Sequence, residues 1–131
     1  MTRKTVWLDR RIARPGPFLA LCLSEAEFRA AAQALKAPSI SQWCSSDATT
    51  HTFEHVDGKG PCCIVCIQGR EKHGPIEVAG LLVHEAVHVW QEYCEGIGER
   101  NPGSEQEAYG IQSIAQELLA EFARRMRLKR R

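Results

Sequence analysis

The sequence predicts an α+β fold, in which a short β-sheet with a hairpin packs on a helix carrying His-Glu-x-x-His and on a C-terminal helix. The chain has 131 residues, 44% hydrophobic and 25% charged, as is usual for one globular domain. Residues 18–23 and 62–67 are short apolar runs typical of buried strands. Residues 75–94 and 104–127 carry apolar side chains at helical spacing. We therefore expect residues 1–131 to form a single domain with a basic tail at about residues 124–131.

The first half of the chain predicts a strand followed by a helix. Residues 18–23 form the strand, and Ser24 with Glu27 three residues later has the form of a capping box that opens a helix. This helix is expected to reach about Ala37, because Pro38 disfavours helical backbone in the residue before it.

Two further strands are predicted at residues 49–56 and 61–68. They flank Asp57-Gly58, a pair that favours the positive φ angles of hairpin turns. Residues 62–67 are apolar on both faces, so this strand is expected to be central and well buried. An extended peptide could add to the edge of such a sheet, but the sequence leaves open which strand forms that edge.

The second half predicts two helices. Pro75 suits the first helical position, and Gly96 and Gly98 suit the end of a helix near Cys94. Its predicted core line is Gly80, Val83, Val87, Trp90 and Cys94. The last helix starts near Ser104, and its predicted buried line is Ile111, Ile114, Leu118 and Phe122.

The motif with the clearest chemistry is His84-Glu85-Ala86-Val87-His88. Residues four apart on a helix lie on one face, so His84 and His88 can direct two imidazole nitrogens at one zinc ion. Glu85 lies about 100° further round the axis, where it can act as general base toward a metal-bound water. The alternative interpretation is an amphipathic helix that contains these residues by chance.

A catalytic zinc ion usually has three protein ligands, and no histidine follows His88. Glu107 lies four residues before Ile111 on the inward line of the last helix, so we predict it as the third ligand. Glu105 is the alternative. The competing interpretation is a capping box, in which Glu107 would bind the Ser104 backbone N–H.

The motif at residues 84–88, with Glu107-Ala108 downstream, resembles the gluzincin pattern of HExxH followed by a helix bearing Glu-Ala. More narrowly, residues 84–91 and 107–112 resemble small metallopeptidase-like proteins encoded in phages and prophages. The likeness covers residues 75–122. It implies a zincin-like fold, Zn²⁺ bound by His84, His88 and Glu107, and Glu85 as the base. Larger members of the family have a second domain that closes the cleft, for which this chain has no room.

The function expected from these residues is zinc-dependent hydrolysis of peptide bonds in a protein or peptide substrate. Tyr109 is the first candidate for stabilising the oxyanion, with Tyr93, His55 and His73 as alternatives. The other class of function is a non-catalytic phage or prophage protein that binds zinc for its structure or for an interaction.

The hydropathy, cysteine content and net charge of the chain argue against several classes of protein. No stretch approaches the ~20 apolar residues that span a bilayer, and no apolar run follows the charged start, so we expect a cytoplasmic protein, in the host cell if phage-encoded. The six cysteines are then expected to be reduced. Cys63 and Cys66 match CxxC, but they would face opposite sides of a strand. The net charge of +1 and a basic tail do not predict nucleic-acid binding, and the oligomeric state stays open.

Overall fold

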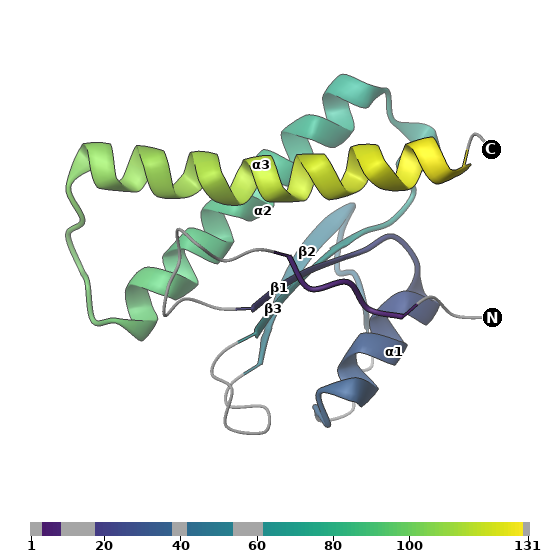
Figure 1. Ribbon diagram of the computed structural model, residues 1–131, viewed down its shortest axis with the longest axis horizontal. Coiled ribbons are helices and arrows are strands. Elements are labelled where there is room, and N and C mark those ends of the chain that lie inside the picture. The colour runs from purple at the N-terminus through teal and green to yellow at the C-terminus, as the bar shows by residue number, and fades with distance from the viewer. Residues whose placement is uncertain (1–3, 9–17, 38–41, 54–61, 130–131) are drawn as a thin grey trace.

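The computed structural model describes residues 4–8, 18–37, 42–53 and 62–129. Its elements are β1 (Phe18–Cys22), α1 (Glu25–Ala34), β2 (Ala48–Phe53), β3 (Cys62–Ile67), a 3₁₀ turn (Arg70–Lys72), α2 (Pro75–Gly96) and α3 (Ser104–Lys129). The α+β prediction is confirmed, because a three-stranded sheet packs against three helices (Figure 1). Within the described residues no helix is long and apolar enough to cross a membrane.

The sheet has the order β1-β3-β2, with β3 in the centre. β1 runs parallel to β3, and β2 runs antiparallel to it with Thr50 opposite Val65. The predicted pairing of the second and third strands is therefore confirmed, while its turn at Asp57-Gly58 lies outside the described residues. All six residues of β3 are buried, as their two-sided apolar pattern predicts. Two edges remain, and β2 forms one of them.

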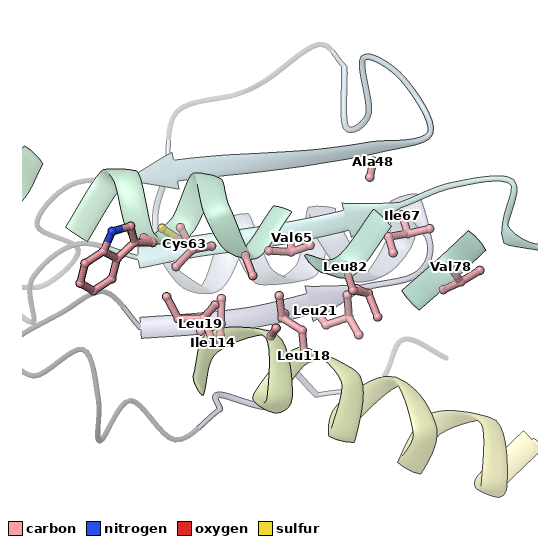
Figure 2. Packing of buried hydrophobic residues seen from close by; sticks show 14 of the residues in the cluster. Leu19, Leu21, Ala48, Cys63, Val65, Ile67, Val78, Leu82, Ile114 and Leu118 are labelled. Carbon is pink, nitrogen blue, oxygen red and sulfur yellow. The ribbon is translucent and has the colours of Figure 1, made fainter. Parts of the chain in front are cut away.

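Each face of the sheet has its own core. On one face, Leu82 of α2 and Leu118 of α3 pack against Leu21 and Val65 of the sheet (Figure 2). On the other face, Phe28 of α1 packs among the remaining strand side chains, as expected for α1 lying opposite the two long helices (Figure 1). Both cores can form because successive side chains along a strand point to opposite faces of the sheet.

The cysteines follow the same alternation. Cys63 lies in the core beneath α2 and α3, whereas Cys66 lies in the core beneath α1, so the CxxC pair does face opposite sides. All six cysteines are buried, and none of them forms a disulfide. They act as small core residues.

The predicted helix starts are confirmed, and one predicted end is not. The Ser24 hydroxyl accepts the Glu27 backbone N–H at 3.2 Å, and Pro75 is the first residue of α2. α1 ends at Ala34 rather than near Ala37, because Lys36 adopts a φ of 56°, which is not helical.

The predicted core line of α2 is wrong in its first half and right at Trp90 and Cys94, which are buried. Val83 is 42% exposed and Gly80 is exposed, whereas Val78, Leu82 and Val89 are buried against the sheet. α2 carries apolar residues around most of its circumference, so spacing alone could not show which line meets the sheet.

The helices α2 and α3 run in opposite general directions and cross (Figure 1). They approach closely at Gly110, since a Cβ there would lie 2.2 Å from the Trp90 ring. Ile114 and Leu118 are buried as predicted, and the other two residues of that line, Ile111 and Phe122, are partly buried against the same core.

Candidate metal centre

The helix α2 brings three ligand-capable side chains together. One ligand atom from each of His84, Glu85 and His88 lies within 4.8 Å of the other two. The Nε2 atoms of the two histidines are 3.3 Å apart, and their rings meet edge to face. This pairing follows directly from helical geometry, because the two residues are one turn apart.

The separation of the two nitrogens fits a metal ion. Two nitrogens that each lie about 2.0–2.1 Å from a tetrahedral zinc ion are about 3.3–3.4 Å apart. The His88 Nδ1 atom is 3.1 Å from Gln91 Oε1, and an amide oxygen can only accept a hydrogen bond. Nδ1 therefore carries the hydrogen, which leaves the lone pair of His88 Nε2 facing His84. The pair is a possible metal-binding group by donor type and by spacing.

Both histidines are exposed to solvent. The His84 side chain is 67% exposed. This exposure follows from the corrected core line, because α2 turns Val78, Leu82 and Val89 toward the sheet, and these residues lie about 80–160° round the helix from the two histidines. A metal held here would be accessible to solvent and to a substrate.

Glu85 lies on the buried side of the group. It is 3% exposed, and its Oε1 atom accepts a hydrogen bond of 2.8 Å from the Thr50 hydroxyl of β2. Its other oxygen, Oε2, lies 3.9 Å from His84 Nε2. One carboxylate oxygen is thus anchored to the sheet, and the other faces the histidines.

The group opens into a cleft of about 350 Å³ between α2 and the edge strand β2. Its lining is almost entirely polar, with hydroxyl groups from the strand and its preceding loop and an additional carboxylate from Glu92. The lining residues on the strand side are Ser45, Ser46, Ala48, Thr49, Thr50 and Thr52. The sequence left open which strand forms the sheet edge to which a peptide could add. The strand that lies beside the histidines in this cleft is the edge strand β2.

Glu107, the predicted third ligand, is not brought to this group. Its Oε2 atom accepts a hydrogen bond of 3.1 Å from the Trp90 indole N–H. Trp90 follows His88 by two residues and so projects about 200° further round α2. As a ligand Glu107 stays a prediction, and that role would require its carboxylate to leave the indole. The alternative, Glu105, is exposed at the start of α3.

The candidates for oxyanion stabilisation also lie elsewhere. Tyr109 is 63% exposed on α3, and Tyr93 packs against Trp90 with ring centroids 5.3 Å apart. The His73 ring lies between Glu77 and Asp47, with nitrogen–oxygen distances of 3.2 and 3.3 Å. His55 is outside the described residues. None of the three described side chains lines the cleft.

The thiols near the cleft do not supply another ligand. Burial raises the pKa of Cys63 to about 12, and the nearby charge of Glu92 adds to that effect. In the absence of a metal the thiol therefore stays protonated at neutral pH, and Cys63 is not among the residues that line the cleft.

The residue that the sequence did not single out is Thr50. Its signal was present in the alternation of the predicted strand, because Ala48, Thr50 and Thr52 share one side of β2 and all three line the cleft. Nothing local indicates that this side meets Glu85.

No protein-family model matches the chain, and comparison with curated proteins and with solved structures finds no match either.

Proposed function

We propose that the protein is a zinc-dependent peptidase, in which His84 and His88 bind the metal and Glu85 is the general base. The observation that carries this proposal is the orientation of Glu85. Its buried carboxylate is held through Oε1 by Thr50 while Oε2 faces the histidine pair. A site used only for structure needs four protein ligands and has no need of a general base oriented beside them.

A bound zinc ion would polarise the scissile carbonyl and lower the pKa of its water. Glu85 takes the proton from that water and passes it to the leaving amine. Thr50 keeps the Glu85 carboxylate in one orientation, so the free oxygen need not reorganise during the proton transfer. Gln91 holds the proton on His88 Nδ1 and so keeps Nε2 available for the metal.

The edge strand β2 supports a peptide as substrate. Edge strands carry backbone N–H and C=O groups that an extended peptide can pair with. β2 is both an edge of the sheet and one wall of the cleft. A peptide added to β2 would pass beside Glu85 and the two histidines.

The resemblance to small gluzincins supports the same ligand set, with Glu107 as the third ligand. Replacement of Glu107 by Gln is then expected to weaken zinc binding by about 10-fold or more, whereas Glu105→Gln leaves it unchanged. Equal zinc affinity of both variants and the wild type would remove Glu107 from the ligand set.

The decisive experiment compares wild type with Glu85→Gln on an unfolded protein substrate. Both proteins are expected to bind one zinc ion per chain, and only the wild type cleaves. Glu95→Gln is the matched control, because Glu95 is an exposed glutamate on the same helix. Stoichiometric zinc without cleavage by the wild type, over a broad set of peptides, would instead support the non-catalytic zinc-binding protein. Absence of bound zinc would exclude both.

A further inference from the structure

The outermost line of α3 carries no charged residue between Glu105 and Arg127, although Glu117 and Arg124 flank it. Tyr109, Gln112, Gln116, Ala120 and Ala123 follow one another at spacings of three and four and are all exposed. A helix at the surface of a monomer normally turns charged side chains to water. Charge is instead placed at the two ends of this line, with Glu105 before it and Arg127 after it, both exposed.

The neighbouring side of α2 is also uncharged and exposed. Ile76 is 84% exposed and Val83 is 42% exposed, and Gly80 between them is exposed as well. These residues lie on the line that helical spacing marks as a core face. The core of the chain leaves them uncovered, so α2 as well as α3 presents an uncharged line of residues to solvent.

An apolar groove lies at the basic end of this surface. It has a volume of about 770 Å³ and lies between the first half of α2 and the last half of α3. Leu119, Phe122 and Ala123 form its α3 wall, and Arg70 and Arg127 stand at its rim. The opposite end of the two helices is acidic on balance, with exposed Glu95, Glu99 and Glu105 against one exposed arginine, Arg100.

We propose that this surface binds a second copy of the chain, with the two α3 helices antiparallel across a two-fold axis at Gln116. Glu105 and Arg127 lie eleven residues on either side of Gln116, so each Glu105 meets Arg127 of the second copy. The same register places Tyr109 opposite Ala123 and Gln112 opposite Ala120.

This register is self-complementary in charge and in size. A two-fold interface must present the same patch on both partners, and here the acidic end of one copy meets the basic end of the other. Tyr109 is 63% exposed and stands opposite a small residue that lines the groove, so its ring enters that groove. An uncharged centre with aromatic anchors and a charged rim is the usual composition of a protein interface.

The first test is the molar mass of the wild-type chain in solution, measured by sedimentation over a range of concentrations. A dimer is expected, and Ala120→Glu should weaken it by at least about 10-fold, because an unpaired charge would be buried on each side of the axis. Ala34→Glu is the matched control, since Ala34 is an exposed alanine at the end of α1, and it should leave the dimer unchanged. A monomer at every concentration would overturn the proposal.

The second test examines the register. Glu105→Arg and Arg127→Glu should each weaken the dimer, by about threefold to 10-fold, and the double variant should restore it. Gln116→Cys should form a disulfide-linked dimer at a dilution where Ala34→Cys does not. A dimer that is insensitive to the charge reversals, or that fails to cross-link through position 116, would place the interface on another surface and overturn the proposal.

Discussion

Replacement of Thr50 by Val tests the link between the edge strand and the proposed base. Valine has nearly the shape of threonine and favours strands, so the substitution removes one hydroxyl with little change in packing. That hydroxyl donates the 2.8 Å hydrogen bond to Glu85 Oε1. Because Glu85 is only 3% exposed, water cannot readily replace the lost donor.

The expected cost follows from the charge and burial of the acceptor. A hydrogen bond to a charged group contributes about 1.5–3 kcal/mol, and an exposed threonine changes stability by less than about 0.5 kcal/mol when replaced. Thr50→Val should therefore lower the free energy of unfolding at neutral pH by about 1.5–3 kcal/mol. For a domain of this size the melting temperature should fall by about 5–15 °C.

Urea and thermal unfolding of the metal-free protein measure this effect. Thr52→Val is the matched control, because Thr52 lies on the same side of β2, is exposed, and has only a long 3.9 Å contact to the Cys63 sulfur. In a double-mutant cycle, Thr50→Val and Glu85→Gln should couple by about 1 kcal/mol or more. Equal stability of the two threonine variants, or a coupling near zero, would refute the anchoring of Glu85 by Thr50.

Three further predictions concern the metal, the helix crossing and the buried thiols. Zinc at about 100 times its dissociation constant should stabilise the wild type by about 2.7 kcal/mol in thermal unfolding, and neither a chelator-treated sample nor His84→Ala should show this gain. Gly110→Ala should destabilise the protein by about 1–3 kcal/mol, because the added Cβ would lie 2.2 Å from the Trp90 ring. Gly80→Ala is the control and should stabilise α2 by about 0.5–1 kcal/mol, because no atom lies within 4 Å of the added Cβ. If both substitutions stabilise the protein, the close approach of α2 and α3 at Gly110 is contradicted. The Cys63 thiol has a pKa raised from 9.0 to about 12, so the folded state keeps its proton where the unfolded state loses it. Stability should therefore fall as pH rises from about 9 to 12, and Cys63→Ala should reduce that slope in urea titrations; an unchanged slope would contradict the assignment.

The sequence identified the elements whose signals are local. Ser24 and Pro75 marked helix starts through their backbone chemistry, and the two-sided apolar pattern of residues 62–67 marked the central strand. It also identified Ile114 and Leu118 as buried, because α3 has one narrow apolar line. The same reasoning failed for Val83, since α2 offers several apolar lines and only contact with the sheet and α3 selects among them.

At the site, the sequence by itself determined that His84 and His88 share one face of a helix and that Glu85 lies about 100° further round its axis. Both follow from the fixed rise and rotation of a helix, so five consecutive residues suffice. Only the tertiary structure decided that Glu85 is buried, that Thr50 holds it, that β2 is the edge strand of the cleft and that Glu107 lies against Trp90. These contacts join residues from 17 to 35 positions apart or depend on strand order, and no local spacing determines how separate elements pack.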